Sequence, residues 1–309
     1  MQSTPIHSRP FRDDADFWRI RQLAIDTYPI TGPGWNWDIR RWDGSRFYNP
    51  DPALPASWSR TIRLWETGGG KLAGAANVDG PGLFFLQIHP DFREIEEEMI
   101  AWAEESLPAA VAGGGSREIQ TEVYEYDVPR QRILASRGYE KLPEGMVIRK
   151  MRLWNQALPA VQLTESYRLR EIHGPEWADC QRLADLLNAA FNRTFHQAGE
   201  YYQFSQHAPC IRDDLHLLAE APDGSFAAHV GVIYDEANRR GLFEPVCTHP
   251  AHRRKNLAQD LMREGLRRAA ALGAIEMTVE TGDMIPANAL YDSLGFSEVY
   301  KGFAWKKTF

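Results

Sequence analysis

The feature that most constrains the fold of this chain is an internal repeat with a long period. The segment Ile88–Arg93 (IHPDFR) recurs as Thr248–Arg253 (THPAHR). Further on, Leu134–Tyr139 (LASRGY) recurs as Tyr291–Phe296 (YDSLGF). The first residues of these pairs are 160 and 157 positions apart. Two landmarks in the same order at nearly one offset predict two copies of one structural unit.

The length of the chain agrees with two copies. It has 309 residues, whereas one domain usually takes about 100–200. We expect a first domain over residues 1–153, a linker over 154–166 that contains Pro159, and a second domain over 167–309. The composition, 43% hydrophobic and 25% charged, is ordinary for a soluble globular protein.

Hydrophobic periodicity predicts a similar series of elements in both halves. In the second half we expect strands at Tyr167–Ile172, Leu215–Glu220, Phe226–Tyr234, Leu242–Thr248, Ile275–Glu280 and Val299–Lys306, and helices at Trp177–Phe191, Leu257–Leu272 and Pro286–Leu294. In the first half we expect strands at Ser59–Glu66, Lys71–Val78, Leu83–Ile88, Glu118–Tyr126 and Met146–Leu153, and helices at Asp14–Thr27, Ile95–Leu107 and Arg130–Arg137. Helices that flank a mainly antiparallel sheet make an α/β (α+β) fold.

Several classes of protein are disfavoured by composition. The three cysteines, Cys180, Cys210 and Cys247, fit neither a disulfide framework nor a metal site, and we expect no metal. The net charge of −7 argues against a nucleic-acid binder. No apolar stretch is long enough for a membrane span, and the first residues lack the apolar core of a signal peptide. We therefore expect a cytoplasmic protein, either a monomer or a homodimer.

The passage with the clearest chemistry runs from Leu242 to Ala258. A strand enters, a short basic loop turns, and an amphipathic helix leaves. A helix N-terminus presents free N–H groups and a partial positive charge, and Arg253, Arg254 and Lys255 add three cations at this point. The passage is therefore either an anion site or a basic, solvated start of a helix.

This passage resembles motif A of the GCN5-related N-acetyltransferase (GNAT) family, whose pattern is Arg/Gln-x-x-Gly-x-Gly/Ala. Arg253, Asn256 and Ala258 occupy its three positions, with Asn256 where glycine is usual. Asparagine tolerates the left-handed region better than most residues, so we expect altered cofactor binding rather than its loss. The resemblance implies an acetyl-CoA site at the segment 246–248 and the loop and helix start 253–258, comprising Val246, Cys247, Thr248, Arg253, Arg254, Lys255, Asn256, Leu257 and Ala258.

A second passage, Pro286–Phe296, resembles motif B of the same family. Tyr291 matches the tyrosine that commonly protonates the leaving thiolate in that family. The family's cofactor-binding asparagine is replaced by Met284, and Asn288 or Asp283 is expected to compensate. Together the motifs imply two tandem GNAT folds and N-acetyl transfer from acetyl-CoA to an amine.

The resemblance also suggests how the remaining steps are divided. Glu244, on the strand before the cofactor loop, is the candidate base, or alternatively a salt-bridge or substrate-binding carboxylate. The backbone N–H of Val246 or Cys247 is expected to polarise the thioester carbonyl. Glu280 is a weaker candidate for the base, and His249 is expected to be structural.

The first copy lacks each of these groups. By the repeat offsets, the basic loop corresponds to Arg93–Glu98 (REIEEE), Glu244 to Phe84, and Tyr291 to Leu134. We therefore expect a degenerate first domain without catalysis. The alternative for the whole chain is a non-catalytic sensor that binds acyl-CoA.

The acceptor is open at this level. Small-molecule amines, amino acids, antibiotics and peptide N-termini all remain, and the aromatics of Phe191–Gln206, chiefly Phe195 and Tyr202, would either line the acceptor site or pack locally. The Trp-rich insertion Thr31–Pro55 is either a ligand-binding loop or a segment packed over the edge of the core.

Overall fold

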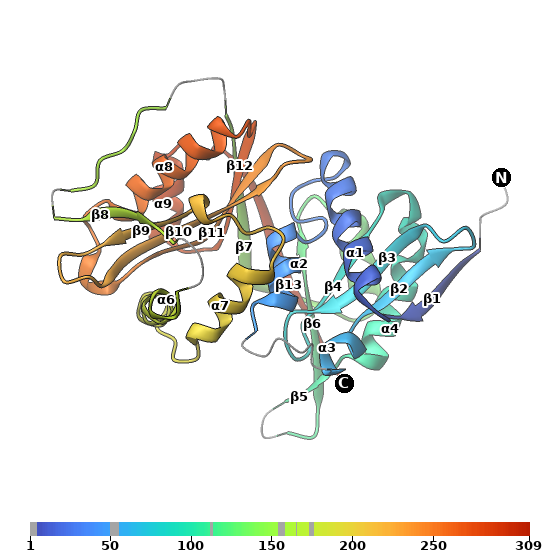
Figure 1. The fold of residues 1–309 in the computed structure, drawn as a ribbon. Coiled ribbons are helices and arrows are strands. Elements are labelled where there is room, and N and C mark those ends of the chain that lie inside the picture. The colour runs from blue at the N-terminus through green and yellow to red at the C-terminus, as the bar shows by residue number, and fades with distance from the viewer. Residues whose placement is uncertain (1–4, 50–55, 112–113, 154–157, 165, 173–175) are drawn as a thin grey trace. The chain divides into compact units, whose positions relative to one another are not determined.

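A computed structural model describes residues 5–49, 56–111, 114–153, 158–164, 166–172 and 176–309. The chain divides into two compact units (Figure 1). The first unit comprises Met1–Ile39, Leu54–Val147 and Tyr300–Phe309. The second comprises Arg40–Ala53 and Ile148–Val299. The predicted linker 154–166 lies partly outside the described residues, as does the end of the Trp-rich insertion.

The units are not the contiguous halves of the chain. A short piece of the first half, Arg40–Ala53, belongs to the second unit, and the last ten residues, Tyr300–Phe309, belong to the first. Two long strands, β7 (Glu140–Arg152) and β13 (Glu298–Thr308), pass from one unit into the other. Each unit therefore depends on sequence from both halves.

The first unit contains a four-stranded antiparallel sheet in the order β1-β2-β3-β4, and β6 pairs antiparallel with β5 and β13. Its strands are β1 (Ile6–Pro10), β2 (Arg63–Thr67), β3 (Leu72–Val78), β4 (Phe84–Ile88), β5 (Ala109–Ala110) and β6 (Arg117–Tyr124). Its helices are α1 (Asp14–Thr27), α3 (Ala56–Arg60), α4 (Glu96–Ser106) and α5 (Val128–Ser136). Helices α1 and α4 both pack on β3 and β4, and the main apolar cluster joins Met99 and Ile100 of α4 to Ala73 and Phe84 of the strands.

The second unit contains strands β8 (Arg168–Glu171), β9 (His216–Glu220), β10 (Phe226–Asp235), β11 (Arg240–Thr248) and β12 (Glu276–Gly282). The order is β8-β9-β10-β11-β12, antiparallel except for the parallel pair β11 and β12. Its helices are α2 (Ile39–Phe47), α6 (Trp177–Phe191), α7 (Ala198–His207), α8 (Leu257–Ala271) and α9 (Ile285–Ser293). The first residue of α2, Ile39, is counted with the first unit.

Two different faces of the second unit's sheet are covered by helices. Helix α8 packs on β9, β10 and β11 over an apolar cluster that includes Leu217, Val230 and Phe243. Helix α6 packs on β10 and β11 and also contacts α7 (Figure 1). Because strand side chains alternate between faces, the neighbours of Val230, such as His229, point to the face opposite α8.

The mixed, mainly antiparallel sheets flanked by helices confirm the predicted fold class. The predicted helix that ends at Gly273 is α8, and Gly273 has a left-handed φ of 92°, as a glycine that stops a helix often does. Among the described residues, five strands and α-helices were not predicted: β1, α2, α3, β5 and α7. The Trp-rich insertion is helical at Ile39–Phe47 rather than a loop there.

Candidate functional site

The site in the second unit is organised by a bulge in β11. The ladder between β10 and β11 shifts register so that Glu244 and Pro245 together face Gly231. A Cβ atom at position 231 would lie 2.4 Å from the carbonyl oxygen of Glu244. Only glycine fits this approach, so the bulge that presents Glu244 requires Gly231.

The pairing of β11 with β12 ends next to this bulge. The parallel ladder between them runs from Arg240 to Phe243, whereas pairing with β10 continues to Thr248. Beyond Phe243, one edge of β11 therefore faces the opening between the two strands. Backbone N–H groups on that edge can receive an acyl group's carbonyl oxygen.

The ladder pattern tells which N–H groups point into the opening. The His249 N–H donates to the Ala227 carbonyl over 2.8 Å. Since hydrogen-bonded pairs alternate in an antiparallel ladder, the Cys247 N–H points toward β10. The N–H groups of Val246 and Thr248 point the other way, toward the opening. Of the two predicted donors, Val246 has the suitable direction and Cys247 does not.

The basic loop leads directly into α8. Asn256 is the N-cap of this helix, with a left-handed φ of 58°, and Arg254 has a φ of 61°. Asn256 thus adopts the conformation for which the family's pattern uses glycine. Its side chain makes no capping hydrogen bond, so the N–H groups of the first turn are directed out of the helix end. This arrangement suits the pyrophosphate of a nucleotide.

Two of the loop's cations hold the loop itself. Arg253 donates to the carbonyl oxygens of Ala190 (3.0 Å) and Thr248 (3.5 Å). Lys255 donates to the hydroxyl of Tyr167 over 2.6 Å, and that hydroxyl also lies 2.8 Å from Nδ1 of His252. Arg254, between them in sequence, is exposed. The loop is braced by side chains that sequence reasoning assigned to the cofactor alone.

Tyr291 lies at the buried face of α9. It is 4% exposed and its ring packs edge-on against Phe296 at 6.1 Å between centroids. It shares an apolar cluster with Phe243, where β11 and β12 part, and with Leu257 at the start of α8. Burial raises the pKa of Tyr291 to about 12. The hydroxyl therefore carries its proton at neutral pH, as a general acid must.

Asn288, predicted to contact the cofactor, is engaged in fixing α9. Its Oδ1 accepts from Nε of Arg149 over 2.7 Å. Its Nδ2 donates to the carbonyls of Gly282 (3.2 Å) and Met284 (3.0 Å). A bond to a cofactor would have to replace one of these, so the cofactor role of Asn288 stays a prediction with a competing structural one.

Glu244 faces a residue that sequence reasoning missed. Its Oε1 lies 3.4 Å from Nη1 of Arg40, and the Glu244 side chain is 42% exposed. Arg40 comes from α2 and packs over the rings of Tyr48 (5.4 Å) and Phe204 (5.2 Å). No sequence signal joins Arg40 to Glu244, because the two lie in opposite halves of the chain.

Two buried histidines lie on the same side of the sheet. His216 and His229 are each 1% exposed, with ring centroids 5.5 Å apart. Burial lowers the pKa of His216 to about 3 and that of His229 well below its usual range, and the charge of Arg40 adds to both shifts. Burial also raises the pKa of Cys247 to about 12. All three groups are therefore neutral at physiological pH.

The aromatic residues predicted to line the acceptor site lie around α6 and α7. Phe195 is 58% exposed and its ring lies 4.5 Å from that of His196. Tyr202 on α7 packs edge-on against Trp177 at 5.5 Å. These contacts are local, and the substrate role of both residues stays a prediction.

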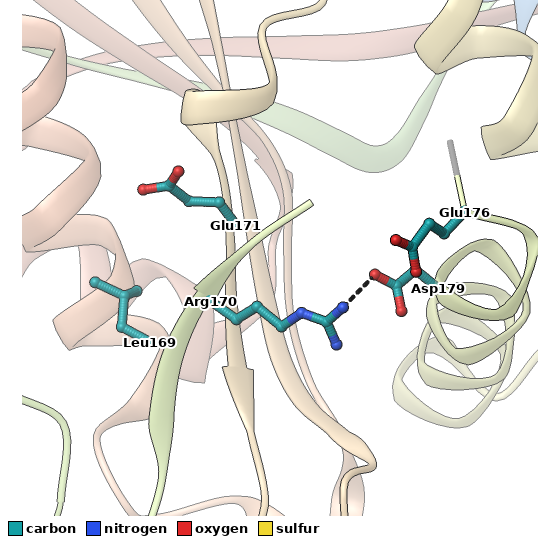
Figure 2. Close-up of a pocket in the computed structure, with 5 residues that line it drawn as sticks. All are labelled: Leu169, Arg170, Glu171, Glu176 and Asp179. Atoms are coloured by element: carbon teal, nitrogen blue, oxygen red, sulfur yellow. Dashed lines mark hydrogen bonds and ion pairs between the residues drawn. The ribbon is translucent and has the colours of Figure 1, made fainter. Parts of the chain in front are cut away.

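A pocket of about 430 Å³ lies elsewhere, between β8 and the start of α6 (Figure 2). Its lining charges are largely neutralised: Arg170 pairs with Asp179 (2.6 Å) and Glu220 (2.9 Å), and Glu171 pairs with Arg268. Strand β8 is at the edge of the sheet, and β9 and β10 separate it from β11. The charges that line this pocket neutralise one another, and the pocket is separate from Glu244 and Tyr291.

The corresponding loop of the first unit is filled by its own side chains. Glu96 is fully buried and pairs with Arg93 (2.9 Å) and with Arg130. Both guanidinium groups lie over the ring of Trp35, at 4.5 and 5.3 Å. One member of the acidic run is thus the centre of a buried ion-pair network. Phe84 and Leu134, which replace Glu244 and Tyr291, are fully buried.

Within the residues that the structure describes, no three His, Cys, Asp or Glu side chains are grouped so as to hold a metal ion. Over the same residues, no helix is both long and apolar enough to span a membrane.

Known proteins resemble this chain in one segment of its sequence and in its fold. Residues 180–296 match the profile of the Acetyltransferase (GNAT) family. A GCN5-related N-acetyltransferase from Sphaerobacter thermophilus is 18% identical with a TM-score of 0.64, covering 98% of this chain and 95% of that chain. A tandem GNAT protein from the clavulanic acid biosynthesis pathway is 15% identical with a TM-score of 0.67, covering 98% of each chain. No curated protein matches.

At 15–18% identity the solved structures show the fold only, whereas the match to the family concerns residues 180–296. The profile covers the segment that holds the bulge of β11, the basic loop and Tyr291, and the two solved structures extend over nearly the whole chain. Residues 180–296 therefore match the GNAT acetyltransferase family, and nearly the whole chain shares the fold of a tandem GNAT protein.

Proposed function

We propose that the protein is an N-acetyltransferase that moves the acetyl group of acetyl-CoA to a primary amine in its second unit. The observation that carries the proposal is the opening between β11 and β12. It combines outward N–H groups on β11, a helix start at a left-handed Asn256 that leaves the first N–H groups open, and a protonated Tyr291 in the same unit.

The reaction follows from these positions. The neutral amine attacks the thioester carbonyl carbon, and the Val246 N–H stabilises the oxygen as it becomes negative. The C–S bond breaks, and Tyr291 gives its proton to the departing thiolate. Glu244 takes the proton that the amine nitrogen loses. After product release Glu244 gives its proton to solvent and Tyr291 takes one back, which restores both groups.

The degenerate loop of the first unit supports a single working site. A pyrophosphate would meet the carboxylates of Glu96 to Glu98 there, and the nearby cations Arg93 and Arg130 are already paired with Glu96. We assign the first unit a structural role toward the second, with no catalysis of its own.

The test is release of free thiol from acetyl-CoA in the presence of a panel of amines. The wild type should turn over at least one amine, and Tyr291→Phe should lower kcat by roughly 10²–10⁴-fold with acetyl-CoA affinity nearly unchanged. Arg212→Gln, at an exposed ion pair with Asp214, is the matched control and should retain full activity. Equal kcat values for Tyr291→Phe and the wild type would overturn the role of Tyr291.

The alternative is a sensor that binds acyl-CoA without turnover. One observation favours it: Glu244 is engaged by Arg40, as a structural carboxylate would be. The two functions differ in their response to Glu244→Gln. A transferase loses activity with that change, whereas a sensor shows acetyl-CoA binding, no turnover of any amine, and indifference to the substitution.

A further inference from the structure

The side of the sheet that carries Arg40 holds polar groups for which the proposed reaction has no use. Arg40 lies at the carboxylate of Glu244, and the His216 and His229 rings lie on the neighbouring strands. Tyr201 of α7 lies 5.7 Å from the ring of His216. All of these residues belong to the second unit.

The strand register places both imidazoles next to the bulge. His216 on β9 is opposite Gly231, the residue against which the Glu244 carbonyl packs. His229 on β10 is opposite Cys247. Arg40, His216, His229 and Glu244 therefore form one cluster.

The imidazoles of this cluster have unused hydrogen-bonding capacity. Neither ring nitrogen of His216 or His229 has a hydrogen-bond partner in the described part of the chain. A neutral imidazole offers one N–H donor and one acceptor. Burying such groups unpaired costs about 1–3 kcal/mol each, so native structures usually supply water or a ligand as their partner.

Arg40 is held in place before any ligand arrives. Its guanidinium lies over the rings of Tyr48 and Phe204, and these rings contact each other edge-on at 5.5 Å. The side chains of Arg40 and Glu244 are 17% and 42% exposed, so both can be reached from solvent. A positive group and a negative group are thus fixed side by side, 3.4 Å apart.

We propose that the acceptor is an amine that also carries a carboxylate, an amino-acid-type zwitterion. Its amine binds at Glu244 and its carboxylate at Arg40, and the N–H groups of His216 and His229 line the polar end of the same site. This inference rests on the proposed acetyltransferase function, and it selects amino acids among the amines left open by the sequence.

The charge arrangement explains the selection. An acceptor with an ammonium group and no anion competes with Arg40 for Glu244. It leaves the guanidinium without a replacement for this carboxylate. A polyamine or aminoglycoside also brings further positive charges toward Arg40, which costs energy in a partly buried site. A zwitterion replaces both halves of the Arg40–Glu244 pair, so each side chain exchanges one ionic partner for another.

The experiment compares matched acceptors on the full-length protein. Each common L-amino acid is tested against its own carboxamide, which keeps the amine and side chain but removes the negative charge. We expect kcat/KM to be roughly ten- to a hundredfold higher for the preferred acid than for its amide. The amine of an amide loses its proton at least as readily, so this comparison is biased against the inference.

Variants of Arg40 provide the second arm. Arg40→Gln should raise KM for the acid and lower it for the amide, whose ammonium no longer competes with the guanidinium for Glu244. The preference should therefore disappear, while acetyl-CoA affinity by calorimetry stays at the wild-type value. Arg40→Lys keeps the charge and should retain part of the preference. Arg212→Gln should retain all of it. The comparison of acid and amide on the wild type does not depend on how well the variants fold.

The outcomes separate this inference from the proposed function. Acetylation of amides or simple amines, with no preference for free acids, overturns the inference and leaves the acetyltransferase. An equal loss for acid and amide in Arg40→Gln also overturns it. If acetyl-CoA binds and no amine is turned over, the proposed function fails. Titration of the free amino acids into the CoA-bound protein then still decides the inference, because an absence of binding contradicts it.

Discussion

At the scale of single residues, the two buried histidines make the stability of the protein depend on pH. His216 and His229 are neutral in the folded protein because burial disfavours their charged forms. In the unfolded chain a histidine takes up a proton near pH 6.5. Below that pH the unfolded state binds more protons than the folded state, so stability falls as the pH drops. Above it the stability is fully present.

This gives a prediction for unfolding by urea. Between pH 7.5 and pH 5.5 the free energy of unfolding should fall by about 1.4 kcal/mol for each of the two imidazoles. His216→Gln should remove the contribution of one imidazole to this loss of stability. His207→Gln, at an exposed position on α7, should leave the loss unchanged. A wild-type protein as stable at pH 5.5 as at pH 7.5 would show that the rings find partners when protonated.

At the scale of elements, the bulge of β11 is the part on which the site depends. Gly231→Ala places a methyl group against the Glu244 carbonyl, at 2.4 Å without adjustment. Overpacking of this kind costs about 1–3 kcal/mol, and relief would require β11 to move away from β10. We therefore expect a lower melting temperature together with a fall in kcat that exceeds the loss of folded protein.

The matched control is Gly115→Ala in the first unit, where an added Cβ meets nothing within 4 Å. It should keep both the melting temperature and the activity. Wild-type kcat in a folded Gly231→Ala protein would mean that the bulge does not position the reacting groups.

Much of this element-scale picture was predictable from sequence. The strand β11, the basic loop and α8 follow from apolar periodicity and a cluster of cations, and the resemblance drew attention to Tyr291. The register shift at Glu244 could not be predicted, because it depends on how β10 pairs with β11. Helix α2 was missed because a short segment containing Gly44, three arginines and two aromatics has no clear apolar stripe.

At the scale of the whole molecule, each unit contains a segment from the other half of the chain, so the halves cannot be separated without loss. Arg149, in the part of β7 that belongs to the second unit, donates to Asn288 and pairs with Asp292 on α9. Strand β13 pairs with β6 of the first unit over Gly302–Thr308. Sequence repeats locate the two copies but cannot show that each borrows a segment from the other's half.

A fragment covering residues 167–309 should therefore lose stability. It lacks Arg40–Ala53 and the Arg149 segment, and it leaves the end of β13 without β6. We expect a lower melting temperature and at least about tenfold weaker acetyl-CoA binding than in the full chain. A fragment starting at Ile148 restores Arg149 and should recover part of both. A fragment 167–309 that melts and binds like the full chain would contradict the dependence of each unit on both halves.

The measurement that tests the central claim most directly is the calorimetric stoichiometry of acetyl-CoA. The open edge of β11 and the open start of α8 occur in the second unit, whereas the corresponding loop of the first is occupied by the buried Glu96 network. We predict one molecule of acetyl-CoA bound per chain. Two molecules per chain would contradict a single working site, and an absence of binding would contradict the acetyltransferase itself.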